Sequence, residues 1–315
     1  MTLFDALQIN VPIEDSSLAA FSALGAERRM LQRTLRGVAE CSGIGVHSGE
    51  KVMLRLLPAD PDTGIVFIRT DLKNGARAIP ARWDHVVDTQ LCTVIGNQAG
   101  SRVATIEHLM AALRAFEIDN ALIEINGAEV PVMDGSSDPF VFLVEMAGVT
   151  EQNQPRRHIE ILKSVEVKSA NKFAKLIPDE ESRFSFAIEF DQKPIQSQAY
   201  EFTLSSDGFK SEIGRARTFG FYEEVDQLRK MGFARGGSLT NAIVIRDNSV
   251  INEEGLRYEN EFVRHKLLDA VGDMALAGAP IRGHFHGHCS GHALNNQLLR
   301  ALFADPEAWR LADLS

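Results

Sequence analysis

The stretch from Glu261 to His292 reads EFVRHKLLDAVGDMALAGAPIRGHFHGHCSGH, and the rest of the chain is interpreted around it. Its first half has the spacing of an amphipathic helix, in which His265, Asp269 and Asp273 recur at every fourth residue. Residues with this spacing project from nearly one face of a helix. An imidazole and a carboxylate one turn apart can bind one metal ion, and the second carboxylate can orient a neighbouring histidine. An ion pair on a solvated helix face is the plainer interpretation of the same pattern.

Length and composition narrow the class of protein. The 315 residues suit two domains of about 150 residues each. A net charge of −10 argues against a general nucleic-acid binder, so a phosphate-bearing substrate would need a local basic patch. The three cysteines, Cys41, Cys92 and Cys289, are odd in number and lack CxxC spacing. They predict reduced thiols rather than a disulfide framework, as expected in the cytoplasm.

Neither a membrane span nor a secretory signal is predicted. No apolar run approaches the roughly 18 residues that a transmembrane helix needs. The first residues, MTLFDALQINVPIED, carry acids where a signal peptide carries basic residues. We therefore expect a cytoplasmic protein. Residues 1–30 are interpreted as an N-terminal extension with one short helix, SSLAAFSALGAERRM, capped by Ser16 or Ser17.

The order of the predicted elements indicates two domains of similar construction. Residues 31–150 show strand patterns, then a helix in ATIEHLMAALRAF and, after another strand, a helix in DPFVFLVEMAG. Residues 151–158 are polar, contain a proline and have no periodicity, which predicts a linker. Residues 159–315 again begin with strand patterns and end with helices. This succession predicts two α+β domains.

Several residues outside the central helix have the chemistry of a hydrolytic site. Glu107 and His108 are adjacent on a first-domain helix, where they could act as a base and a metal ligand, although a surface carboxylate beside a half-buried imidazole is the commoner arrangement. His292 begins the last helix and, near a carboxylate such as Asp273, suits a general acid, but it could equally be a capping-region histidine. Thr218 could donate to an oxyanion or serve as a helix cap.

The strand GHFHGHC places His284, His286 and His288 on one face, because side chains alternate along a strand. Three imidazoles so arranged could bind a second metal ion. A solvated strand edge is the alternative, and histidine-rich tracts are often no more than that.

Together these segments resemble a known family. The segments QRTLRGVAECSGIGVHSG, DTQLCT, TIEHLMAAL, PVMDGSSDPF, ARTFGF, FVRHKLLDAVGD and SGHALNNQLL occur in order between Gln32 and Phe303. They are similar to those of the UDP-3-O-acyl-N-acetylglucosamine deacetylases, the zinc amidases of lipid A synthesis. The resemblance implies two α+β domains packed face to face, with one zinc ion per chain between them.

The resemblance also implies roles for individual residues. His108, His265 and Asp269 match the zinc ligands, Glu107 the general base and His292 the general acid. The carboxylate partner of the acid matches Asp273, and the oxyanion donor matches Thr218.

The implied substrate is a UDP-linked acylated amino sugar. Lys266 resembles a substrate contact, Phe190 and Lys172 resemble contacts to the nucleoside and phosphate, and the segment from Phe219 resembles an insert that forms a passage for the acyl chain. Plausible wall residues of that passage are Val225 and Ala242. The chain departs from the family pattern at Cys289, where a basic residue is common, in its N-terminal extension and in its histidine-rich strand.

The implied activity is removal of the N-acetyl group, which gives acetate and a free amino sugar. Two alternatives are a zinc amidase for another acylated amino sugar and a catalytically inactive protein that retains the metal. The presence of both Glu107 and His292 argues against the inactive protein. No obligate protein partner is evident, and the acylated substrate leaves open a transient contact with a membrane surface.

Overall fold

The structure is a computed structural model that describes residues 30–73 and 77–313. Apart from Met30, the N-terminal extension and the short helix predicted in it lie outside the described residues.

A five-stranded sheet with two helices on one face forms the first half. Its strands, in spatial order, are β2 (Ala39–Ile44), β3 (Lys51–Pro58), β9 (Ala121–Ile125), β4 (Ile65–Arg69) and β5 (Ala78–Pro80). Alternate residues of β3 are buried, as expected for a sheet with one covered face. The covering helices are α2 (Glu107–Ala115) and α3 (Asp138–Ala147). A smaller sheet contains β6 (Val86–Asp88), β7 (Val94–Gly96) and β8 (Arg102–Val103).

The second half is built around a seven-stranded sheet. Its central strand β19 (Ile281–His288) pairs with strands on both sides. The remaining strands are β11 (Arg157–Ile161), β12 (Val165–Ser169), β13 (Lys172–Ile177), β14 (Ser182–Glu189), β15 (Ser197–Thr203) and β20 (Trp309–Asp313). The two long helices are α6 (Glu261–Ala275) and α7 (His292–Ala304). Short helical turns at α4 (Ser206–Gly208) and at Phe209–Ile213 follow β15.

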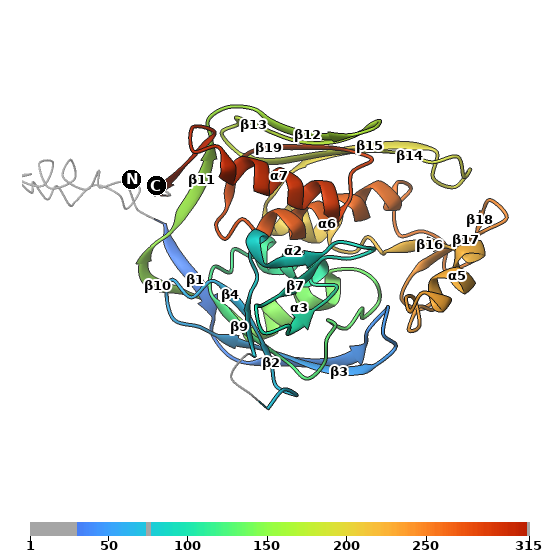
Figure 1. The fold of residues 1–315 in the computed structure, drawn as a ribbon, viewed down its shortest axis with the longest axis horizontal. Coiled ribbons are helices and arrows are strands. Elements are labelled where there is room, and N and C mark those ends of the chain that lie inside the picture. The colour runs from blue at the N-terminus through green and yellow to red at the C-terminus, as the bar shows by residue number, and fades with distance from the viewer. Residues whose placement is uncertain (1–29, 74–76, 314–315) are drawn as a thin grey trace, which may run out of the picture.

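The helices of the two halves face each other between the two sheets. Figure 1 shows the first-half sheet below, the second-half sheet above, and α2, α3, α6 and α7 in the layers between them. Helices α2 and α6 approach so closely that a Cβ atom on Gly272 would lie 2.0 Å from the carbonyl oxygen of Glu107. The predicted α+β fold, with two similar halves packed face to face, is confirmed. Because helices from both halves meet there, the interface can hold a shared site.

The expected linker forms strands. Residues 149–155 are strand β10 (Val149–Pro155), which pairs with β1 (Leu31–Leu35), and β11 begins at Arg157. The segment predicted to be a linker, residues 151–158, is thus ordered as strand, because backbone pairing with β1 holds a segment that has few apolar residues of its own. The division into domains at 31–150 and 159–315 stays a prediction.

An insert lies beside the helical layers, on the right of Figure 1. It contains a three-stranded sheet and one short helix: β16 (Phe219–Phe221), α5 (Val225–Lys230), β17 (Ile243–Arg246) and β18 (Ser249–Val250). Within the described residues, no helix combines the length and apolar character needed to cross a bilayer.

Candidate metal centre and active site

The face of α6 predicted to carry a metal site is buried at the interface of the two halves. His265, Asp269 and Asp273 are only 2 %, 4 % and 3 % exposed. Apolar residues on the other faces of α6, such as Phe262 and Leu267, are buried as well, because this helix packs against its own sheet and against α2. A solvated ion-pair face is thereby excluded for these three residues.

Three ligand atoms converge where α2 meets α6. The Nε2 atoms of His108 and His265 each lie 3.5 Å from Oδ1 of Asp269. Ligands bound at about 2.0–2.2 Å to a tetrahedral metal are separated by about 3.3–3.6 Å, so this spacing fits a single ion. Oδ1 of Asp269 is buried and has no hydrogen-bond partner. Among the described residues, these three form the group of potential metal ligands whose atoms lie within 4.8 Å of one another.

The protonation states also suit a cation. Burial lowers the pKa of His265 to about 3, so its imidazole is neutral and keeps a lone pair. Burial opposes the charge on Asp269, but neighbouring groups, among them the charged ammonium of Lys266, outweigh burial and hold the pKa of this carboxyl well below its usual value. Nζ of Lys266 donates to Oδ2 of Asp269 at 2.6 Å, which leaves Oδ1 directed at the histidines. The donor set therefore comprises the neutral imidazole of His265, the imidazole of His108 and the carboxylate of Asp269, the combination found in catalytic zinc sites.

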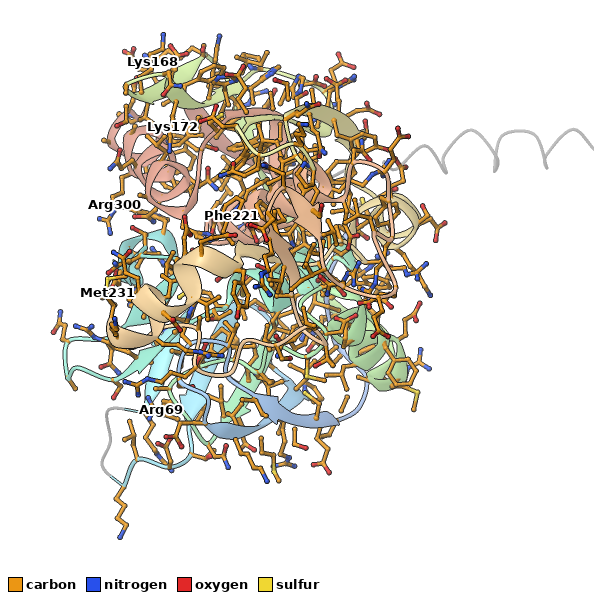
Figure 2. The ribbon with its side chains drawn as sticks, turned by 90° about the vertical axis from the view of Figure 1, so that its right-hand side faces the viewer. Arg69, Lys168, Lys172, Phe221, Met231 and Arg300 are labelled. Atoms are coloured by element: carbon orange, nitrogen blue, oxygen red, sulfur yellow. The ribbon has the colours of Figure 1, made fainter. Side chains whose placement is uncertain are left out.

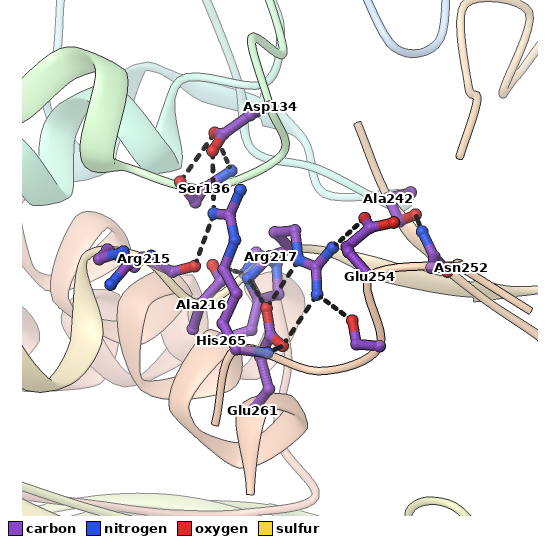
Figure 3. A network of polar contacts seen from close by, with 12 residues as sticks. Asp134, Ser136, Arg215, Ala216, Arg217, Ala242, Asn252, Glu254, Glu261 and His265 are labelled. Atoms are coloured by element: carbon purple, nitrogen blue, oxygen red, sulfur yellow. Dashed lines mark hydrogen bonds and ion pairs between the residues drawn. The ribbon is translucent and has the colours of Figure 1, made fainter. Parts of the chain in front are cut away.

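A buried polar network holds the segment that orients His265 (Figure 3). The carbonyl oxygen of Ala216 accepts a hydrogen bond from Nδ1 of His265 at 3.1 Å, which assigns the lone pair to Nε2. The next residue, Arg217, forms an ion pair with Glu261, the first residue of α6, at 2.9 Å. Glu261 is fully buried and Arg217 is 2 % exposed. The pair ties the 216–218 segment to the start of the helix that carries His265 and Asp269.

A carboxylate and a histidine face each other beside the three ligands. Oε1 of Glu107 lies 3.8 Å from Nε2 of His292. Nδ1 of His292 lies 2.9 Å from Oδ2 of Asp273, which leaves Nε2 as the nitrogen turned toward Glu107. Burial disfavours the imidazolium, but Asp273 and Glu107 outweigh this effect and raise the pKa of His292 to about 9. Burial raises the pKa of Glu107, with His292 and His108 acting in the opposite direction.

Two residues that were quoted in motifs but given no role support this pair. Thr93 donates from Oγ1 to Oδ1 of Asp273 at 2.6 Å, and its backbone N–H donates to Oε2 of Glu107 at 3.1 Å. Asn295 donates to Oδ2 of Asp273 at 2.8 Å. Both residues lie in family-like segments, DTQLCT and SGHALNNQLL, and that position was the only signal in the sequence.

A row of aromatic rings leads from the ligands to the insert. The ring of Phe219 lies 6.3 Å from that of His265 and 5.0 Å from that of Phe262. Phe190 follows, 5.9 Å from Phe219 and 6.0 Å from Phe221. In Figure 2, Phe221 lies near the middle of the face that the insert occupies, with Met231 on the helical part of the insert. Of the predicted substrate contacts, Phe219 and Phe190 therefore lie together in this row, and Lys266 contacts the ligand Asp269.

Other predicted substrate residues lie farther out. Lys172 is at the turn of the β12–β13 hairpin, opposite Ser169, near the top of Figure 2. No hydrogen bond, ion pair or ring contact among the described residues joins it to the site. Val225 begins α5, and the carbonyl of Ala242 accepts from Asn252 at 2.9 Å, so both belong to the insert. The roles of these residues stay predictions.

Thr218 and His47 lie beside residues of the site. Thr218 lies two residues after Ala216, whose carbonyl accepts from His265. The backbone N–H of Thr218 donates to the carbonyl of Gly135 at 2.8 Å and so connects the two halves. His47, which received no role from the sequence, lies near enough to His292 for the two rings to affect each other's charge. Burial lowers the pKa of His47, Glu129 opposes the shift, and His292 lowers it further.

The histidines of β19 pack within the sheet face. Nε2 of His284 lies 2.6 Å from Oγ of Ser185, and the ring of His284 lies 3.7 Å from that of His286. His288 stacks on Phe173 at 5.5 Å. They do not form a group of three converging ligand atoms among the described residues, so the second metal site that the strand pattern left open has no support.

The fold and this site define a metal-dependent hydrolase made of two α+β halves. The sequence matches the family described as UDP-3-O-acyl N-acetylglycosamine deacetylase over residues 32–304. It is 51 % identical over 286 residues to the UDP-3-O-acyl-N-acetylglucosamine deacetylase of Acidithiobacillus ferrooxidans, covering 90 % of this chain and 93 % of that protein. The enzymes of that name from Vibrio parahaemolyticus and Phenylobacterium zucineum are each 49 % identical, covering 88 % and 90 % of this chain and 92 % and 96 % of their own. The chain belongs to this deacetylase family.

Proposed function

We propose that this chain carries out the deacetylation of its family at one zinc ion held by His108, His265 and Asp269. The reaction hydrolyses the N-acetyl group of UDP-3-O-acyl-N-acetylglucosamine to UDP-3-O-acyl-glucosamine and acetate, the committed step of lipid A biosynthesis. Family membership supports the reaction and the substrate class. The proposed location of this chemistry is the cytoplasm.

One observation carries the assignment of the site. Two imidazole Nε2 atoms lie 3.5 Å from a buried carboxylate oxygen that has no other partner, and Glu107 and His292 lie beside them. Leaving such atoms unpaired costs free energy, so the cluster indicates a cation. Zinc is favoured by the two-nitrogen, one-oxygen donor set with an open fourth position. Ferrous iron is the alternative ion, because imidazole and carboxylate also suit it.

The residues around the ion divide the proton transfers between them. When bound, zinc supplies a Lewis acid that polarises the amide carbonyl and acidifies the attacking water. Glu107 takes the proton of that water, because its buried carboxylate lies next to the ligand His108 in the chain and faces His292. Thr218 donates to the oxygen that becomes negative as the tetrahedral centre forms.

His292 acts on the leaving nitrogen. An amine leaves poorly as an anion, so the nitrogen must be protonated as the C–N bond breaks. Nε2 of His292 faces Glu107 across the site, and Asp273 keeps the ring charged and in one orientation. The acid and the base thus approach the amide from two sides.

Substrate groups outside the amide are assigned to the surrounding elements. Lys266 contacts the sugar end near the ligands, and Phe219 begins the insert, whose Val225 and Ala242 line the passage for the acyl chain. Phe190 and Lys172 meet the nucleoside and phosphate. The aromatic row from Phe262 to Phe221 supports an apolar path in this direction.

A zinc amidase for a different acylated amino sugar is the second candidate, and an inactive metal-retaining protein is the third. Release of acetate from UDP-3-O-acyl-N-acetylglucosamine by the zinc-loaded chain separates them. Turnover of this substrate is expected. Bound zinc without turnover would instead favour one of the two alternatives.

Two variants test the division of roles. Glu107→Ala should keep its zinc and lose a factor of about 10² to 10⁴ in kcat, the usual contribution of a general base. His265→Ala should lose zinc. Metal content and acetate release are measured on both proteins. Equal loss of zinc in the two variants would contradict the assignment of Glu107 as a base rather than a ligand.

A further inference from the structure

A cavity lies at the end of α2 opposite to the proposed catalytic residues. It has a volume of about 530 Å³, within the range of about 300–1,000 Å³ typical of small-molecule sites. Its lining comes from both halves and includes Arg114, Arg156, His158 and Arg282. Arg114 lies about 10 Å from Glu107 along the helix, at about 1.5 Å of rise per residue. A neighbouring cavity of about 690 Å³ shares Arg114 and Arg156 with it.

Two buried side chains of this lining have polar atoms without partners. His158 is 4 % exposed, and neither of its ring nitrogens has a hydrogen-bond partner. Arg156 is 1 % exposed, and its Nη2 also lacks a partner, although Nη1 and Nε pair with Glu117 and Asp119 at 2.9 Å each. Buried donors in native proteins nearly always have partners. Because both side chains line the same cavity, a ligand with acceptor atoms in that cavity would supply the missing hydrogen bonds.

The charges of the lining favour an anion. The guanidinium of Arg114 makes no hydrogen bond or ion pair with any described residue. Burial and Arg156 lower its pKa to about 10, although Asp119 and Glu117 act in the opposite direction. Nε of Arg282 donates to the backbone carbonyl of Glu180 at 2.5 Å, so its charge is not neutralised there. The acids of the lining are Glu117 and Glu180, and Glu117 is already paired with Arg33 and Arg156.

We propose that this cavity binds a phosphate group, either as the free ion or as part of a small phosphorylated metabolite, through Arg114, Arg156 and His158. A phosphate offers several acceptor oxygens in different directions, which matches donors that come from three side chains on separate parts of the chain. A carboxylate has only two oxygens and one charge. The site is separate from the metal centre, and its occupancy does not depend on the proposed deacetylation.

Equilibrium dialysis of the zinc-loaded full chain against labelled inorganic phosphate tests the proposal. Arg114→Gln removes a charge without breaking a described ion pair, and His158→Leu removes both ring nitrogens without breaking a described hydrogen bond. Each should weaken phosphate binding about tenfold or more, the usual effect of one charge-assisted or buried hydrogen bond. Arg55→Gln is the matched control, since this arginine pairs with Glu124 on the first-half sheet, is absent from the cavity lining and should leave binding unchanged.

The outcomes distinguish the site and the source of the phosphate. Binding that persists in Arg114→Gln and His158→Leu but disappears in His265→Ala would place the phosphate at the metal and overturn the proposal. Absence of binding up to about 10 mM, for phosphate and for glucose 1-phosphate alike, would also overturn it. Tighter binding of glucose 1-phosphate than of the free ion, lost in the same two variants, identifies a phosphorylated metabolite as the ligand. Tighter binding of inorganic phosphate than of glucose 1-phosphate, lost in the same two variants, identifies the free ion as the ligand.

The fold of the His158→Leu variant is checked by thermal unfolding. Because the ring nitrogens have no partners, its midpoint should stay unchanged or rise. If the variant unfolds at a lower temperature, Arg114→Gln decides the question alone, since Arg114 is only partly buried.

Discussion

Replacement of Glu261 by glutamine tests whether the buried pair with Arg217 holds the metal-binding helix in place. Oε1 of Glu261 accepts from the backbone N and the Nε of Arg217 at 3.0 and 2.9 Å. Oε2 accepts from Nη2 of Arg217 and the backbone N of Arg257 at 3.2 and 2.6 Å. An amide at this position places an NH₂ group against one of these two sets of donors and removes the charge that balances Arg217.

The expected cost is large because the carboxylate is fully buried. Removal of one partner of a buried ion pair costs about 3–5 kcal/mol. That is a substantial part of the 5–15 kcal/mol or so by which folded proteins are stable. With a urea slope of about 3 kcal/mol per M, the unfolding midpoint of the metal-free protein should fall by about 1–1.7 M.

The same substitution at Glu254 is the matched control. Glu254 pairs with Nη1 of Arg217 at 2.6 Å, but its side chain is 56 % exposed, so Glu254→Gln should leave the midpoint nearly unchanged. A second measurement follows zinc affinity, which should fall tenfold or more in Glu261→Gln because Ala216 next to Arg217 orients His265. If the two variants unfold at the same urea concentration and bind zinc equally, the positioning role of Glu261 is refuted.

Three further predictions concern the acid, the helix interface and the metal. Asp273→Asn is nearly isosteric but removes the charge that helps raise the pKa of His292 to about 9. Because the protonated form of His292 is the active one, the basic limb of the pH–rate profile should move to lower pH; an unmoved limb would exclude the assignment of His292 as the acid. Gly272→Ala should destabilise the protein by about 1–3 kcal/mol or more, since its Cβ would lie 2.0 Å from the carbonyl of Glu107. Gly291→Ala, with nothing within 4 Å of its Cβ, is the control in thermal unfolding. Finally, chelation of the metal should lower the thermal midpoint, because zinc at about 1,000 times its Kd stabilises the folded state by about 4 kcal/mol; an identical midpoint with and without chelator would contradict a metal site in the folded core.

Helices and strands with a clear periodic pattern in their sequence could be predicted, whereas strands at the edges of sheets could not. The helix α6 and the strand β19 follow from the spacing of their apolar residues and appear where expected. Strand β20 was missed, because its residues Trp309–Asp313 are largely exposed and hold their place by pairing with β11. The polar strand β10 was taken for a linker for the same reason. Exposed edge strands carry little hydrophobic signal, so partner strands distant in sequence decide their structure.

For the candidate site, too, some features could be predicted from the sequence and others depend on the tertiary structure. The common direction of His265, Asp269 and Asp273 follows from helix geometry within one segment, so the sequence by itself determined it. Family-like motifs added His108, Glu107 and His292 as expected members, but no local rule places those side chains within reach of α6. Only the packing of α2 against α6, which Gly272 permits, brings His108 to 3.5 Å from Asp269.

The supporting contacts came from the tertiary structure alone. Thr93 and Asn295 reach Asp273 from separate segments of the chain, and Glu261 meets Arg217, 44 residues earlier in the sequence, with the insert between them. The cavity lined by Arg114 and His158 likewise exists only where the two halves meet. A local pattern records which face of an element is apolar or polar, because that depends on helical or strand periodicity. It does not record which distant face packs against it, because that choice depends on how the whole chain buries its surface.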